Sequence, residues 1–280
     1  MKKCLIILNR YKEEALKISK EIEIFLKEKN IETISIFFEK NTTGFSLEGI
    51  SFVITLGGDG TVLYAARIAC KEQVPIFPIN LGQFGFIAGI SPNNWKAPLI
   101  QFLNKELSVT ERTLLCVKVL RNKKEIFYST ALNDAVIRTS GPAQISELII
   151  DYNQRSFGKF KADGVVVATS TGSTAYSAAA GGPIVDPAID AFVLSPICPF
   201  SLSNRPLVLN SDGKLTIKVL PSRGAEIVLS CDGQEIIKLM SDDIIIMEKN
   251  KEKALLVGCD SSVFYSALQS KLNWSGGPNA

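Results

Sequence analysis

Short apolar segments alternate with amphipathic ones over the first 80 residues, and this alternation limits the possible folds more than any other feature. The segments 3–10, 31–38, 50–56 and 74–80 have the composition of strands. Between them, segments 11–30 and 61–72 carry apolar residues at helical spacing, in the first case at Leu16, Ile18, Ile22, Phe25 and Leu26. Strands that alternate with helices indicate a parallel sheet. We therefore predict an N-terminal parallel-sheet α/β domain over residues 1–108.

The pattern changes after residue 108, where strand-like segments follow one another with turns between them. We predict a β-rich, β-sandwich-like C-terminal domain over residues 109–262. Residues 263–280 return to helical spacing, with Val263, Phe264, Leu268 and Leu272 on one side. This last segment is expected to be a helix that packs back on the N-terminal domain.

Composition and charge exclude several classes of protein. The net charge of +3, from 31 basic and 28 acidic residues, is too balanced to indicate nucleic-acid binding. No apolar stretch reaches the roughly 18 residues that span a membrane, and we expect neither a signal peptide nor an anchor. The six cysteines are far apart and are expected to be reduced, buried thiols. These features favour a cytoplasmic protein.

Histidine is absent from the chain. This absence excludes a Ser-His-Asp triad and an H-E-x-x-H metal site. A general base in this protein must therefore be a carboxylate, lysine, tyrosine or cysteine.

The segment "ITLGGDGTVL", residues 54–63, stands where a strand should end and a helix begin. Its glycines are expected to adopt strained dihedral angles and to bring the backbone close to phosphates of ATP, which gives the candidate residues Gly57, Gly58, Gly60 and Thr61. Phosphate repels a carboxylate, so Asp59 should face either a Mg²⁺ ion or a hydroxyl about to lose its proton. A tight turn in which Asp59 caps the helix is the structural alternative.

Three further segments carry polar groups in unusual places. Residues 162–184 combine a strand with a run of hydroxyl-bearing and small residues, which indicates a ligand lining more than tight helix packing. Asn133 and Asp134 form a polar pair inside an apolar strand, and taken alone they are best explained structurally. Asp232 and Gly233 predict a hairpin turn.

Taken together, the segments "GGDGT", "NLGQFGFIAG", "LNDAVI", "KADGVVVATSTGSTAYSAAAGGPIV", "PICPFSLSNRPLVL" and "SCDGQ" resemble the NAD kinase family, in order and over nearly the whole chain. "GGDGT" alone is shared with diacylglycerol and sphingosine kinases. The segments around "TGSTAYS" and "LNDAVI" are specific to NAD kinases.

The resemblance implies transfer of the γ-phosphoryl group of ATP, with Mg²⁺, to the 2′-hydroxyl of the adenosine ribose of NAD, and a homodimer or homotetramer. It implies that Asp59 is the general base and that the β-rich domain binds NAD, and it assigns no protein ligand to a metal. The NAD-binding residues implied are Asp59, Gly60, Phe86, Asn133, Asp134, Gln144, Lys161, Asp163, Thr174, Ala175, Tyr176, Ser177, Ala178, Ala179 and Gln234.

The sequence departs from the family pattern at three positions. Asp134 stands where a glutamate is usual, Phe200 where many members have histidine, and Lys161 where several have arginine. Two alternative functions remain open at this point. A lipid kinase of the diacylglycerol or sphingosine type would use the same "GGDGT", although the hydroxyl-rich segment suits a nucleotide better than an acyl chain. A non-catalytic NAD(P) sensor would keep the pocket without turnover.

Overall fold

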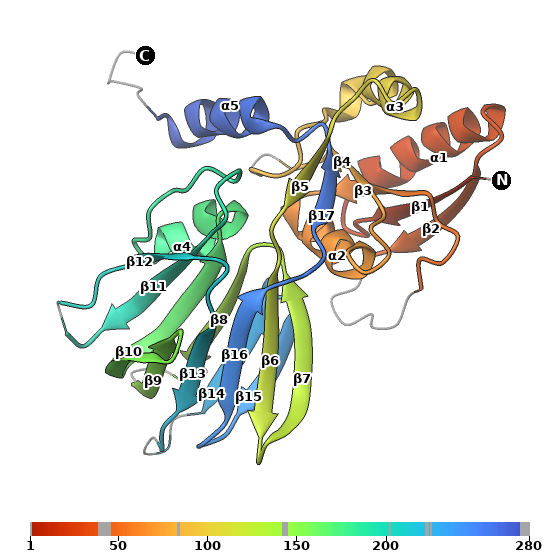
Figure 1. Ribbon diagram of the computed structural model, residues 1–280. Helices are drawn as coiled ribbons and strands as arrows, with labels where there is room; N and C mark the ends of the chain where they lie inside the picture. The colour runs from red at the N-terminus through yellow and green to blue at the C-terminus, as the bar shows by residue number, and fades with distance from the viewer. Residues whose placement is uncertain are drawn as a thin grey trace. The chain divides into compact units, whose positions relative to one another are not determined.

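The computed structural model describes residues 2–38, 46–82, 85–141, 145–201, 203–221, 224 and 226–274. The chain divides into two compact units (Figure 1). The first unit comprises Met1–Arg112 together with Glu252–Ala280, and the second comprises Thr113–Lys251. The chain therefore leaves the first unit once and returns to it near the C-terminus.

The first unit is built on a six-stranded sheet with the order β2-β1-β3-β4-β17-β5. All neighbours are parallel except β17 and β5, which pair antiparallel. The strands are β1 (Lys3–Leu8), β2 (Glu32–Phe37), β3 (Phe52–Gly57), β4 (Ile76–Asn80), β5 (Val109–Arg112) and β17 (Ala254–Val257). Every residue of β3 is buried, as expected for a central strand of a covered parallel sheet.

Helices α1 (Glu13–Glu28) and α2 (Asp59–Ala69) pack against the strands of this sheet. The unit also contains α3 (Lys96–Leu103), α5 (Ser261–Leu272) and a 3₁₀ turn, η1, at Pro92–Asn94. Helix α1 buries Ile18, Ile22 and Phe25 in one cluster with residues of β1, β3 and β4. Leu16, which was grouped with these residues from the sequence, is instead 45% exposed on the opposite side of the helix.

The unit boundaries differ from those predicted from the sequence. The chain passes from the first unit to the second between residues 112 and 113, instead of between 108 and 109. The reason is that β5 at Val109–Arg112 pairs with β17 of the first unit. The chain returns to the first unit between residues 251 and 252, instead of between 262 and 263, because β17 joins the parallel sheet beside β4. The returning segment is thus a strand followed by helix α5, and not a helix alone.

The second unit is a single antiparallel sheet of 11 strands. Its path is β15-β14-β8-β10-β9-β13-β16-β6-β7, with β11 paired to β10 and β12 paired to β11. The strands are β6 (Leu115–Arg121), β7 (Lys124–Ala131), β8 (Asp134–Thr139), β9 (Ser146–Tyr152), β10 (Arg155–Thr169), β11 (Ala191–Pro199), β12 (Leu207–Asn210), β13 (Leu215–Val219), β14 (Ile227–Cys231), β15 (Glu235–Leu239) and β16 (Ile244–Lys249). A 3₁₀ turn, η2 (Thr171–Thr174), and a short helix, α4 (Tyr176–Ala179), follow β10.

Alternate residues of these strands point into one shared core, for example Val117 of β6, Ile137 of β8 and Ile217 of β13. Because every strand of the main path contributes to this cluster, the sheet curls toward a barrel around it. The predicted fold class is confirmed: a parallel-sheet α/β unit and an antiparallel β-rich unit.

The cysteines are free, and five of them are buried as predicted. Cys198 is the exception, since it is exposed near the end of β11. Among the described residues, no helix is long and apolar enough to cross a membrane.

Candidate active site

The "GGDGT" segment forms the junction between β3 and α2 in the first unit. Gly57 ends the strand, Gly58 is the extended residue that precedes the helix, and Asp59 is its first residue. The expectation of strained glycine dihedrals is wrong, because Gly57, Gly58 and Gly60 are not among the glycines with positive φ. Gly57 is instead required by close packing, since a Cβ there would lie 2.1 Å from Thr61 Oγ1.

The carboxylate of Asp59 lies against the segment that follows β4. Its Oδ2 atom accepts a hydrogen bond of 2.8 Å from the backbone N–H of Phe86. A Cβ on Gly85 would lie 2.5 Å from Asp59 Oδ1, so only glycine fits beside this carboxylate. The Oδ1 atom is buried and has no hydrogen-bond partner among the described residues. A buried polar atom without a hydrogen bond lowers the stability of the folded protein, unless a ligand supplies the missing partner.

Two opposing effects determine the proton affinity of Asp59. Burial raises the pKa of its carboxyl above the ordinary value, while the backbone N–H groups of Phe86, Ala88 and Ile87 and the charge of Lys271 lower that pKa. Burial prevails. A raised pKa makes the carboxylate a better proton acceptor near neutral pH.

The other residues of the "GGDGT" segment lie around the start of α2. Gly58 and Gly60 flank Asp59, and Gly60 is exposed. Thr61 is buried, and its hydroxyl has no partner among the described residues. The N-terminus of a helix presents backbone N–H groups that favour an anion, so this junction suits a phosphate group.

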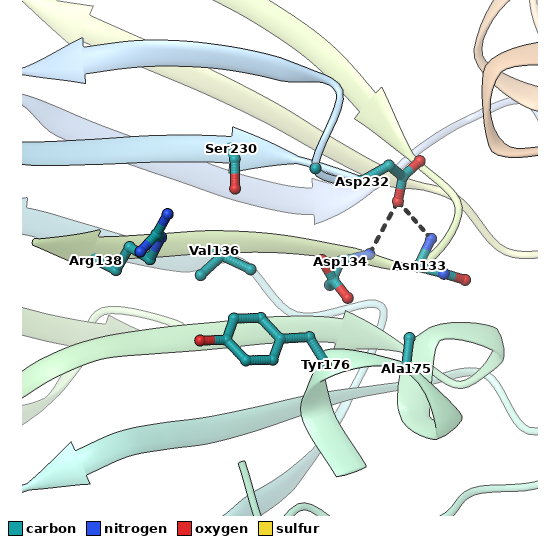
Figure 2. A pocket seen from close by; sticks show the side chains of 9 residues that line it. Asn133, Asp134, Val136, Arg138, Ala175, Tyr176, Ser230 and Asp232 are labelled. Carbon is teal, nitrogen blue, oxygen red and sulfur yellow. Dashed lines mark hydrogen bonds between the residues drawn. The ribbon is translucent and has the colours of Figure 1, made fainter. Parts of the chain in front are cut away.

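The second unit contains a pocket of about 530 Å³ between β8, β14 and the segment that leads into α4 (Figure 2). Asp134, Val136 and Arg138 alternate along β8 and line it on one face of the sheet, as Figure 2 shows. The full lining comprises Asn133, Asp134, Val136, Arg138, Ala175, Tyr176, Ser230, Asp232 and Gly233.

Asp232 organises the end of this pocket where β8 begins. It lies in the hairpin turn between β14 and β15, where Asp232 and Gly233 both have positive φ, so the predicted hairpin is confirmed. Its carboxylate accepts hydrogen bonds from the backbone N–H groups of Leu132 (2.9 Å), Asn133 (2.8 Å) and Asp134 (3.1 Å). Figure 2 shows two of these bonds. Asp232 therefore fixes the backbone that carries the Asn133–Asp134 pair.

This arrangement leaves two polar groups available to a ligand. The side-chain oxygen of Asn133 is buried and has no partner among the described residues. Burial and the neighbouring charge of Asp232 raise the pKa of Asp134 to about 7, against an opposing effect of the Tyr176 backbone N–H. Close to neutral pH, Asp134 can therefore act as a hydrogen-bond donor or as an acceptor.

Two hydroxyl groups of the segment after β10 bind other groups of the protein. The hydroxyl of Ser173 donates to the Ser170 carbonyl at 2.7 Å and accepts from the Val185 N–H at 3.0 Å. The Ser177 hydroxyl is buried against that of Ser195 at 2.9 Å. These two hydroxyl groups stabilise the turn that follows β10.

Comparison with known proteins extends these observations. Residues 27–107 match the family model described as ATP-NAD kinase N-terminal domain, and residues 132–259 match the ATP-NAD kinase C-terminal domain. The chain is 51% identical to an NAD kinase of Treponema denticola over 277 residues, which cover 99% of this chain and 98% of that protein. The chain belongs to the NAD kinase family.

Two solved structures are similar in fold. An NAD kinase from Archaeoglobus fulgidus in complex with ATP matches with a TM-score of 0.76 and 26% identity, over 95% of this chain and 96% of that one. A yeast NADH kinase complexed with NADH matches with a TM-score of 0.87 over 99% of this chain and 89% of that one, at 22% identity. Membership of the NAD kinase family gives no support to the lipid-kinase or sensor interpretation.

The structure gathers some of the residues that the family resemblance implies and leaves others apart. Asp59 meets Phe86 in the first unit, and Asn133, Asp134, Ala175 and Tyr176 line one pocket in the second. The remaining residues of the second unit do not line that pocket: Lys161, Asp163, Thr174, Ser177, Ala178, Ala179 and Gln234.

The surroundings of these remaining residues are varied. Lys161 forms an ion pair of 2.8 Å with Glu147, and Gln234 is a buried residue of the turn between β14 and β15. Asp163 is half-buried on β10. Gln144 lies outside the described residues.

Two residues of these sites were not singled out from the sequence. The carboxylate of Asp232 was interpreted only as part of a turn, although the neighbouring polar pair at Asn133 and Asp134 needed such a partner. Lys271 donates from α5 to the carbonyl of Gly85, beside Asp59. No sequence pattern around Lys271, in the last turn of α5, predicts this contact.

Proposed function

We propose that this protein transfers the γ-phosphoryl group of ATP to the 2′-hydroxyl of the adenosine ribose of NAD, with Asp59 as the general base. The observation that carries the proposal is the carboxylate of Asp59, whose Oδ2 atom accepts a hydrogen bond from the Phe86 N–H while its buried Oδ1 atom has no partner among the described residues. Membership of the NAD kinase family supplies the two substrates.

The proposed reaction balances without histidine. The oxygen of the 2′-hydroxyl forms a bond to the γ-phosphorus, the bond from that phosphorus to the β–γ bridging oxygen breaks, and ADP leaves. The hydroxyl proton passes to Asp59 Oδ1. Phosphoryl transfer has a loose transition state, so the base needs only to orient the hydroxyl and to accept its proton late. Most of the rate acceleration then comes from alignment and from electrostatic stabilisation of the phosphates.

The backbone at the start of α2 is the proposed site for the transferred phosphate. Gly57, Gly58, Gly60 and Thr61 surround Asp59 at this helix terminus, where N–H groups favour an anion. The hydroxyl of Thr61, buried and without a partner among the described residues, is a further donor.

We expect a magnesium ion to arrive with the nucleotide. Mg²⁺ usually keeps several waters and binds through substrate phosphates, so phosphate oxygens would hold it here. When bound, the ion neutralises the charge of those phosphates.

The pocket at Asp134 is the proposed site for the nucleoside part of NAD. The Asn133 oxygen can accept a hydrogen bond, Asp134 can donate or accept one, and Tyr176, 42% exposed, offers a ring for stacking. Further contacts are proposed on the family resemblance alone, as are a homodimer or homotetramer and a cytoplasmic location. They are Gly60, Phe86, Gln144, Lys161, Asp163, Thr174, Ala178, Ala179, Gln234 and, through its backbone because its hydroxyl binds Ser195, Ser177.

The test is product formation by the purified protein. NAD, ATP and Mg²⁺ are supplied, and NADP is detected with an NADP-specific dehydrogenase, beside parallel reactions with NADH, sphingosine and diacylglycerol. NADP formation with no lipid phosphorylation is the expected result. Phosphorylation of a lipid, or calorimetric binding of NAD without any product, would contradict the proposal.

A further inference from the structure

The C-terminal segment of the first unit contacts the segment 85–89 at three successive places. The thiol of Cys259 donates to the carbonyl of Ile87 at 3.1 Å. Val263, at the start of α5, packs on Gly89 so closely that a Cβ there would lie 2.8 Å from its Cγ1. Lys271, in the last turn of α5, donates to the carbonyl of Gly85. The same helix therefore holds both ends of the segment.

The held segment is the one that contacts Asp59. Its Phe86 N–H binds Asp59 Oδ2, and Gly85 leaves the space that Oδ1 occupies. A small shift of Gly85 would therefore move both groups that contact the carboxylate: the Phe86 N–H, which binds Oδ2, and the Gly85 backbone, which lies against Oδ1.

We propose that Lys271 is a positioning residue for Asp59: by binding the Gly85 carbonyl, it holds the Phe86 N–H and the wall of the carboxylate site in place. The inference rests on the proposed role of Asp59. Lys271 acts through the backbone and not on the substrate.

The surrounding packing makes this contact important. A pocket of about 510 Å³ separates the middle of α5 from the segment after β4, with Gly82, Gly85, Ser266, Ser270 and Lys271 among its lining residues. Because the helix does not fill this space, the lysine side chain reaches across it. Its ammonium group also lies 5.9 Å from the centre of the Phe86 ring, a favourable cation–π distance.

The far end of α5 is well fixed, so the helix can serve as an anchor. Asp260 caps it by accepting from the N–H groups of Ser262 at 2.9 Å and Val263 at 3.4 Å. From Val263 to Lys271 the helix rises about 12 Å. Lys271 therefore ties the segment at a point two turns away from the Val263 contact.

Lys271 is also the charged group that faces Asp59 among the described residues. Its positive charge favours the ionised carboxylate and lowers the pKa of Asp59. Cys259 also interacts with Asp59, and burial raises the pKa of its thiol to about 12, so this thiol stays neutral. Removing the lysine charge should therefore raise the pKa of Asp59.

The test compares Lys271→Met, which loses the hydrogen bond and the charge, with Lys271→Arg, which retains both. Lys20→Met, at an exposed lysine of α1 in the same unit, is the matched control. Steady-state rates of NADP formation are measured between pH 5.5 and 9. Hydrogen exchange is followed in the peptide that covers 85–90.

We expect Lys271→Met to lose roughly tenfold to a hundredfold in kcat, because small displacements of catalytic groups are costly. Its KM for NAD should stay within about twofold of the wild type, and the acid limb of kcat/KM should move to higher pH. ATP and Asp134 titrate equally in all variants, so the difference between variants isolates Asp59. Exchange at 85–90 should accelerate. Lys271→Arg should restore most of kcat and the position of the acid limb, and Lys20→Met should match the wild type.

Three results would overturn the proposal: an unchanged kcat, an effect confined to KM, or unchanged exchange at 85–90 in Lys271→Met. The exchange measurement does not depend on activity. If the wild type made no NADP, the proposed function would fail, while exchange at 85–90 would still decide whether Lys271 holds the segment.

Discussion

Replacing Asp134 by asparagine is expected to stabilise the second unit at alkaline pH, although this residue lines its pocket. The folded protein raises the pKa of Asp134 from 3.8 to about 7, through burial and the neighbouring charge of Asp232. Below pH 3.8 the carboxyl is protonated in both the folded and the unfolded chain. Between pH 3.8 and about 7 only the unfolded chain ionises, so folding stability falls as pH rises. Above pH 7 the loss is complete.

The size of the effect follows from the two pKa values. The complete loss corresponds to about 4 kcal/mol, of which about 3 kcal/mol falls between pH 5 and pH 8.5. Asparagine has nearly the same shape and no charge, and its oxygen can still accept from the backbone N–H of Tyr176. The folding stability of Asp134→Asn relative to the wild type should therefore increase by about 3 kcal/mol between pH 5 and pH 8.5.

Hydrogen exchange gives the required local measurement. Both tryptophans, Trp95 and Trp274, belong to the first unit, so tryptophan fluorescence does not report on the second. The amides of β8 and β10 should exchange more slowly in Asp134→Asn than in the wild type. The ratio of the wild-type rate to the variant rate should be roughly a hundredfold larger at pH 8.5 than at pH 5. Glu125→Gln, an exposed carboxylate of the same unit, should show no such change. The reasoning is refuted if the Asp134→Asn effect is equal at the two pH values, or if the variant is the less stable at pH 8.5.

Two further substitutions test the geometry at each site. Gly85→Ala should lower kcat about a hundredfold, since the new Cβ would lie 2.5 Å from Asp59 Oδ1 and must displace the carboxylate. Steady-state kinetics check this, and a change in kcat of less than twofold would contradict it. Ser177→Ala should leave the KM for NAD within about twofold while lowering stability by about 1 kcal/mol, because its hydroxyl binds Ser195 and does not line the pocket. A tenfold rise in KM would show that the Ser177 hydroxyl contacts the substrate.

Local periodicity in the sequence was enough to predict the parallel sheet and the position of Asp59. Strand and helix patterns within residues 3–80 depend on neighbouring residues only, and "GGDGT" lies at the junction that they define. The same reasoning predicted the hairpin at Asp232 and Gly233, because two residues with positive φ leave a strong local signal.

Features that depend on distant partners were not visible in the same way. The strand β17 has four residues, too few for a pattern, and its place beside β4 is set by pairing with a distant part of the chain. Asp232 binds a backbone 100 residues away, and Lys271 binds one 186 residues away. The hydrogen bonds of the Ser173 and Ser177 hydroxyls within the protein were not predicted either, because composition does not tell inward-facing side chains from outward-facing ones.

The most direct test of the central claim is the rate of NADP formation by Asp59→Asn at ordinary and at raised Mg²⁺ or Mn²⁺. The account predicts a large loss in kcat that neither cation restores, with hydrogen exchange at 52–57 unchanged, because asparagine retains the shape but cannot take the hydroxyl proton. Restoration of the rate by either cation would make Asp59 a metal ligand instead of the base, and near-wild-type turnover would remove it from the chemistry altogether.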